Sequence, residues 1–121
     1  VLVDAPCSGE GMFRRHPQAR MEWTVQTPAG CARRQSDILH SAAGLVRGGG
    51  ILCYSTCTFN RLENEGVVEG FLHNHSEFHL KPFVLTPVLR AQASGARAAA
   101  ALISLSNPSI SAGENTPDAW R

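Results

Sequence analysis

The stretch Ile38-Leu-His-Ser-Ala-Ala-Gly-Leu-Val-Arg-Gly-Gly-Gly-Ile-Leu-Cys-Tyr54 predicts a helix followed directly by a buried strand. Its first half places apolar side chains at helical spacing and predicts the end of an amphipathic helix that covers roughly positions 29–47. Three consecutive glycines then stop this helix, because glycine tolerates the positive φ that a helix end favours. The apolar run 51–54 follows directly and predicts a buried strand.

The flanking sequence repeats this alternation. Residues 1–3 are apolar and lead into a loop rich in Pro, Ser and Gly, as expected for a buried strand at its carboxyl end. Residues 12–28 show no clean period and predict a long loop with one helical turn. Asn60 followed by Glu63 resembles a capping box that opens a second helix. Residues 78–84 predict a third strand, in which Pro82 suits only an edge or a bulge. The order of elements predicts parallel strands with helical crossovers, an α/β fold.

The last third of the chain has a different composition. It is rich in Ala and Ser, with four consecutive alanines at 98–101 and Pro108, Gly113 and Pro117 near its end. A helix over 93–105 would lack a well-defined apolar stripe, so we expect an irregular tail. The sequence therefore predicts a partial catalytic domain over 1–83 and an Ala/Ser-rich tail, poorly ordered or frame-shifted, over 84–121.

Charge and cysteine content limit the class of protein. The formal net charge is +1, so no overall basic field indicates a nucleic-acid partner. Arginines cluster locally instead, and they fit either phosphate contact or a solvated surface. No apolar stretch is long enough to span a membrane, and no secretory signal is recognised. The four cysteines lack zinc-knuckle spacing, which leaves a metal-binding module as a disfavoured alternative. We predict a cytoplasmic protein with reduced thiols, no metal and no membrane contact.

Two cysteine-bearing loops follow the first two predicted strands. They read Asp4-Ala-Pro-Cys7-Ser and Ser55-Thr-Cys57-Thr. In open α/β sheets, ligands bind beyond the carboxyl ends of the strands, so both loops lie where chemistry is expected. A thiolate there can add to C6 of a pyrimidine, and the electron density moved to C5 then attacks a methyl sulfonium. We expect a helix that opens near Arg61 to lower the pKa of Cys57.

Ordinary structural roles compete with this interpretation. Free cysteine is among the most buried residue types, and a core role is preferred for Cys53 inside its strand and for Cys31 near a helix start. For Cys7 and Cys57, their shared placement at two strand ends favours catalysis. Asp4 is either a turn former or a contact to a cofactor or base.

Two long motifs carry a resemblance to a known family. The run Val1–Phe13 resembles motif IV of the Nop/Sun (Fmu-type) RNA cytosine-C5 methyltransferases. The run Gly49–Thr58, with Glu63-Asn-Glu65 after it, resembles their motif VI. The segment Gly9–Phe13 is most similar to the bacterial ribosomal RNA branch. The resemblance covers roughly residues 1–83 and implies the C-terminal portion of a Rossmann-like class I methyltransferase sheet, incomplete in this chain.

The resemblance also implies residue roles and a reaction. Cys57 corresponds to the nucleophile, Cys7 to the second cysteine that resolves the covalent intermediate, and Asp4 to a contact with the cofactor S-adenosylmethionine. DNA cytosine methyltransferases use the cysteine of a Pro-Cys pair, here Cys7, but their scheme has no place for the Ser-Thr-Cys-Thr loop. The implied activity is methylation of cytosine C5 in RNA, with ribosomal RNA as the expected partner. A weaker expectation gives phosphate contacts to the arginines Arg14, Arg15, Arg33 and Arg34.

The sequence departs from the family pattern at both ends. The glycine-rich cofactor loop, the acidic ribose contact and the RNA-binding region all precede motif IV in the family and are absent here. We therefore expect a fragment that is inactive alone. After Phe83 the further strands of the family are not recognised, which suggests a frame shift or a truncated gene. The alternatives are a non-catalytic RNA-binding remnant and a tRNA substrate.

Overall fold

A four-stranded sheet organises this computed structural model, which describes residues 1–82 and 99–105. The strands are β1 (Leu2–Asp4), β2 (Ile51–Thr56), β3 (Phe78–Lys81) and β4 (Ala99–Leu105), in the spatial order β1-β2-β4-β3. β1 and β2 are parallel, with Asp4 opposite Ser55. β4 is antiparallel to both of its neighbours. The predicted α/β class is confirmed, but the sheet is mixed rather than wholly parallel.

Strand β4 corrects the expectation of an irregular tail. Its residue Ile103 is fully buried and lies opposite Leu52 of β2 on one side and Leu80 of β3 on the other. The alanine-rich segment shows little strand pattern by itself. It becomes a strand because β2 and β3 both present backbone groups that need hydrogen-bond partners. The expectation for the rest of the tail, 84–98 and 106–121, lies outside the described residues.

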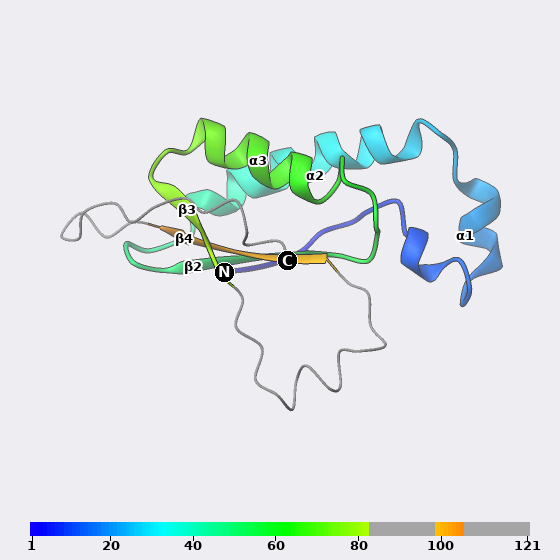
Figure 1. Cartoon of the computed structure of the whole chain (residues 1–121), viewed down its shortest axis with the longest axis horizontal. Helices are drawn as coiled ribbons and strands as arrows, with labels where there is room; N and C mark the ends of the chain where they lie inside the picture. Colours follow the sequence, from blue (N-terminus) through cyan, green and yellow to red (C-terminus); the bar gives the residue numbers. More distant parts are fainter. Residues whose placement is uncertain (83–98, 106–121) are drawn as a thin grey trace, which may run out of the picture.

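The helices lie mainly on one face of the sheet. They are the short 3₁₀ helix η1 (Glu10–Met12), α1 (Pro17–Glu22), α2 (Thr27–Ala43) and α3 (Glu65–Asn74). Figure 1 shows α2 and α3 above the strands and α1 beyond one end. Proline in the first turn starts both α1 and α2, since its missing N–H needs no partner there. The segment 12–28 is therefore more helical than predicted.

Two helix boundaries differ from the sequence prediction. α2 ends at Ala43, before the glycine triplet, because the N–H groups of Leu45 and Val46 turn back to the carbonyls of Ala42 and Ala43. α3 begins at Glu65, so the predicted capping box is wrong. The Asn60 side chain accepts a hydrogen bond from the N–H of Leu62, while the Glu63 side chain is buried elsewhere.

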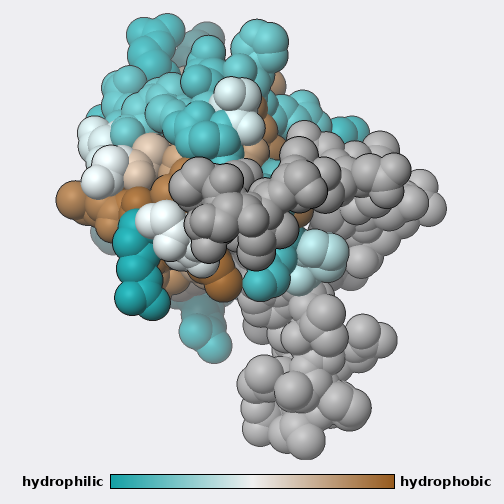
Figure 2. Space-filling view, turned by 90° about the vertical axis from the view of Figure 1, so that its left-hand side faces the viewer, coloured by the Kyte–Doolittle hydropathy of each residue, from teal (hydrophilic) through white to brown (hydrophobic). Residues whose placement is uncertain are grey.

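The core fills the space between the helices and the sheet. Leu39 of α2, Phe71 of α3, Leu52 of β2 and Ile103 of β4 have no exposed surface. The opposite face of the sheet is more open, and Leu2 on β1 is 72% exposed. In Figure 2 hydrophilic residues cover the helical layer, and hydrophobic residues gather below it at the level of the sheet. The helices thus bury one face and leave the strand ends accessible.

Candidate functional site

The two predicted cysteine loops leave the same edge of the sheet. Asp4 is the last residue of β1 and pairs with Ser55, which is next to last in β2. Cys7 follows three residues after β1 and Cys57 directly after β2. Because the two strands are parallel neighbours, their carboxyl ends bring the two loops together.

The two thiols are in direct contact. The Cys7 Sγ and Cys57 Sγ atoms lie 3.2 Å apart, and both cysteines are free. Cys57 is exposed and Cys7 is half-buried. The two turns therefore meet at the sheet edge, as expected. A flat substrate reaching Cys57 would also lie within reach of Cys7.

Several hydrogen bonds fasten one loop to the other. The Ser8 and Thr58 hydroxyls, both buried, share a hydrogen bond of 2.9 Å. The Gly11 N–H donates to the Cys57 carbonyl at 2.9 Å. A Cβ atom at Gly11 would lie only 2.5 Å from that carbonyl oxygen, so glycine is required for this close approach. The backbone of the Cys57 loop is therefore held directly by the loop that carries Cys7.

Glu63 is a site residue that sequence reasoning did not identify. Its side chain is fully buried, and Oε2 accepts hydrogen bonds of 2.8 Å from the Ser8 N–H and from Gln35 Nε2. Gln35 also donates to the Pro6 carbonyl at 2.9 Å. The Tyr54 hydroxyl donates to the Glu63 carbonyl at 2.6 Å. The sequence holds one signal for this residue, the Glu63-Asn-Glu65 run that follows the segment resembling motif VI, whereas the spacing of Glu63 from Asn60 predicts a helix cap instead.

The environment of Cys57 does not lower its pKa. Burial, the hydrogen bond to Cys7 and the charge of Cys7 raise the pKa of the Cys57 thiol to about 11, with a smaller contribution from Asp4. The predicted lowering by a helix start is wrong, since α3 begins only at Glu65, eight positions further along the chain. Cys57 is therefore held as a thiol at neutral pH in this state.

Asp4 lies at the carboxyl end of β1, opposite Ser55 of β2. It is exposed at the end of β1, and its Oδ1 accepts a 2.9 Å hydrogen bond from the Ser55 hydroxyl. An exposed carboxylate held in this way fits the positive charge of a sulfonium. The cofactor contact expected of Asp4 stays a prediction.

The core role predicted for Cys53 is wrong, and Cys31 is not fully buried either. Cys53 is only half-buried, because alternation along β2 points it away from Leu52 and Tyr54 and out of the core. Cys31 is half-buried in α2, where burial and the charge of Glu63 raise the pKa of its thiol. Among the described residues, no group of three or more His, Cys, Asp and Glu side chains is arranged to hold a metal.

All four arginines expected to contact phosphate are exposed, two after η1 and two on α2: Arg14, Arg15, Arg33 and Arg34. Over residues 1–82 and 99–105, we find no helix with the length and apolar character needed to cross a bilayer.

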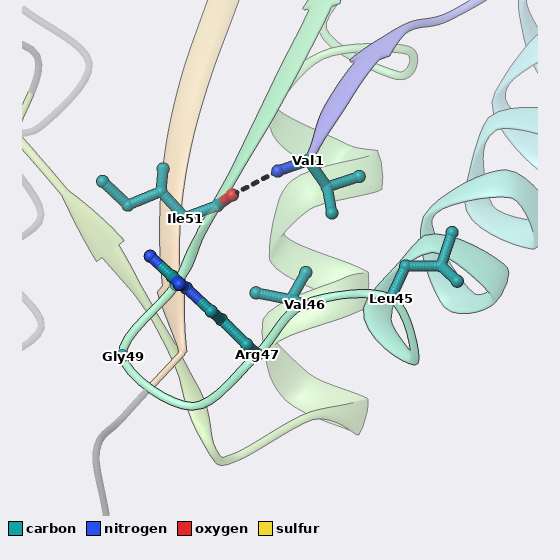
Figure 3. A pocket seen from close by; sticks show the side chains of 7 residues that line it. Val1, Leu45, Val46, Arg47, Gly49 and Ile51 are labelled. Carbon is teal, nitrogen blue, oxygen red and sulfur yellow. Dashed lines mark hydrogen bonds between the residues drawn. The ribbon is translucent and has the colours of Figure 1, made fainter.

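A hollow of about 470 Å³ lies at the opposite end of β2. Figure 3 shows Val1, Leu45, Val46, Arg47 and Ile51 around it, with the Val1 amino group donating to the Ile51 carbonyl. It contains none of the predicted site residues, which lie at the other end of the strands.

Comparison with known proteins gives consistent matches. The model of the family described as 16S rRNA methyltransferase RsmB/F matches residues 1–105. Ribosomal RNA small subunit methyltransferase B of Thermus thermophilus is 46% identical over 82 residues, which are 68% of this chain and 21% of that protein. Ribosomal RNA small subunit methyltransferase F of Citrobacter koseri is 49% identical over 67 residues, or 55% and 14% of the two chains.

Solved structures share the fold. NSun6 from Pyrococcus horikoshii, determined with the S-adenosylmethionine analogue SFG, superposes with a TM-score of 0.64 at 26% identity. The match covers 86% of this chain and 29% of that one. The chain thus spans about a fifth or less of the length of the two curated relatives described above.

Proposed function

This chain belongs to the 16S rRNA methyltransferase RsmB/F family, and from that premise we propose that it carries the thiol chemistry of an S-adenosylmethionine-dependent RNA methyltransferase. The proposed reaction is transfer of a methyl group to C5 of cytosine, with ribosomal RNA as substrate and Cys57 as nucleophile. The relatives are named for the small-subunit ribosomal RNA, which favours this substrate over tRNA. We place the reaction in the cytoplasm.

The contact between the two thiols is the observation that supports this proposal. C5 of cytosine is a poor nucleophile, so a second group must add to the ring before methylation and leave after it. Cys57 is exposed, and Cys7 lies 3.2 Å from it, sulfur to sulfur. One thiol can therefore bond to the ring while the other acts on the same intermediate.

Each step assigns a role to a residue of this chain. A base takes the proton of Cys57, whose sulfur bonds to C6, and the C5–C6 π electrons move to C5. S-adenosylmethionine, when bound, supplies the electrophilic methyl group that C5 takes. Asp4 is assigned to orient the sulfonium by its negative charge. A base then removes the C5 proton, the Cys57–C6 bond breaks, and the Cys57 thiolate leaves. Cys7 is assigned to this release step, because it is the group already in contact with the departing sulfur.

Because the pKa of Cys57 is raised, its thiol must lose a proton before the sulfur can bond to C6. With its pKa raised to about 11, Cys57 is protonated at pH 7. Deprotonation must therefore accompany substrate binding. The target cytosine must also leave its stack to reach the strand ends, as nucleobases do in other base-modifying enzymes.

A non-catalytic RNA-binding protein is the competing proposal. The small share of its relatives that the chain covers favours it, since the chain by itself then supplies only part of a cofactor site. On this ground we propose that the 121-residue chain turns over no substrate alone.

Cysteine variants of the full-length protein test the roles. Labelled S-adenosylmethionine and small-subunit ribosomal RNA are supplied, and covalent protein–RNA adducts are separated on denaturing gels. Cys57→Ala should abolish both methylation and adduct. Cys7→Ala should instead accumulate the adduct, because release is blocked.

Cys53→Ala is the matched control, since this half-buried cysteine points away from the core and is not one of the paired thiols. It should keep both activities. Retained methylation in Cys57→Ala would refute the assigned nucleophile, and exchanged phenotypes would reverse the two roles.

A further inference from the structure

The burial of the Glu63 side chain is unfavourable in free energy unless other interactions compensate for it. Its side chain has no exposed surface, and no Lys or Arg forms an ion pair with it among the described residues. Burying a carboxylate without a cation is unfavourable, so its hydrogen bonds must compensate. Those bonds go to the Ser8 N–H and to Gln35, both at 2.8 Å.

The bonds of Glu63 converge on the two cysteine loops. Ser8 directly follows Cys7, and its hydroxyl is bonded to Thr58, which directly follows Cys57. Gln35 extends the same network to the carbonyl of Pro6, on the other side of Cys7. The residues on both sides of Cys7 are therefore fixed by one carboxylate oxygen, directly or through one amide.

The other carboxylate oxygen has no role in this network. Oε1 of Glu63 is buried and lacks a hydrogen-bond partner, as does Oε1 of Gln35. Both bonds that reach the loop end on Oε2 alone. A neutral glutamine at position 63 can place its single carbonyl oxygen at the Oε2 position and keep both bonds. Position 63 thus requires a side chain as long as that of glutamate that ends in a hydrogen-bond acceptor. It does not require a negative charge.

We propose that Glu63 is the positioning residue that sets the distance between the Cys7 and Cys57 thiols. It acts through Ser8 and Gln35 and touches neither thiol. One part of this inference rests on the proposed function, namely that the set distance places Cys7 correctly for the release step. The distance itself is a property of the protein without substrate.

Disulfide formation measures that distance independently of methylation. Oxidised glutathione reacts with one protein thiolate to give a mixed disulfide and one reduced glutathione. The second protein thiol then displaces a second reduced glutathione, which leaves the Cys7–Cys57 disulfide. Two protein thiols are oxidised and one glutathione disulfide is reduced. The rate of the second step depends on how closely the thiols are held.

The experiment compares four proteins by peptide mapping at a fixed glutathione concentration. Glu63→Ala should slow closure of the Cys7–Cys57 disulfide by about tenfold, because a displacement of less than 1 Å is enough for such an effect. Glu63→Gln should close within about twofold of the wild type, since it keeps the acceptor. Glu69→Ala is the matched control on the exposed side of α3 and should not differ from the wild type.

Circular dichroism identifies any variant that fails to fold. Should Glu63→Ala unfold, Glu63→Asp replaces it, since its side chain is one methylene shorter and retreats from Ser8. Wild-type closure in the alanine or aspartate variant would overturn the inference. Equally slow closure in the folded glutamine variant would overturn it too, because charge rather than an acceptor would then be required. Neither result depends on whether Cys57 is the methyltransferase nucleophile.

Discussion

Gly11→Ala tests how tightly the two loops are joined. The added Cβ would lie 2.5 Å from the carbonyl oxygen of Cys57, which is a backbone atom that cannot rotate away. It would also lie 3.4 Å from the ring of Phe59, an ordinary contact. The loop must therefore retreat by about 0.5 Å or more. The clash falls on the same oxygen that accepts the Gly11 N–H bond of 2.9 Å, so that bond is stretched as well.

The expected cost follows from these two effects. Overpacking of this kind costs about 1–3 kcal/mol, and the weakened hydrogen bond adds about 1 kcal/mol. The free energy of unfolding should therefore fall by about 2–4 kcal/mol, measured by urea denaturation with circular dichroism. Closure of the Cys7–Cys57 disulfide should slow in parallel, because the Cys57 backbone is displaced.

Gly70→Ala provides the matched control. It makes the same chemical change within α3, where an added Cβ meets nothing within 4 Å. Helix propensity then raises stability by about 0.5–1 kcal/mol. An unchanged urea midpoint and an unchanged closure rate in Gly11→Ala would show that the loops are not held at this contact.

Three further predictions follow from the site and the sheet. Cys7→Ala removes the hydrogen bond and the charge that raise the pKa of Cys57, so this pKa should fall from about 11, although burial keeps it above the ordinary value. Alkylation of Cys57 by iodoacetamide, followed against pH by mass spectrometry, should then begin at lower pH, and an unshifted profile would contradict the assigned coupling. Tyr54→Phe leaves the buried Glu63 carbonyl without its donor and should cost about 1–3 kcal/mol in urea denaturation; a neutral effect would show that another donor replaces it. Ile103→Ala should cost about 2–5 kcal/mol, because the side chain is fully buried in β4. No loss of stability in that variant would mean that β4 does not form in solution.

Much of the site was predictable because it depends on local patterns. Apolar runs at 1–3 and 51–54 indicated two strands, and a helix between them requires a parallel pair. The strands β1 and β2 are indeed parallel, and their shared direction brings Cys7 and Cys57 to one edge. Neither step needs knowledge of distant contacts. The α/β class and the contact between the two loops could therefore be predicted from the order of the strands and the helix along the sequence.

The remainder depends on partners that lie far away in the sequence. Glu63 has the sequence context of a helix cap, and only the folded chain brings Ser8, 55 positions away, to its carboxylate. β4 has a weak pattern and forms because β2 and β3 offer it hydrogen bonds on both sides. The pKa of Cys57 rises rather than falls because folding buries its thiol and brings Cys7, 50 positions away, against it. Local propensity determined the elements and their order, whereas burial and long-range hydrogen bonds, which exist only after folding, decided the chemistry of the site.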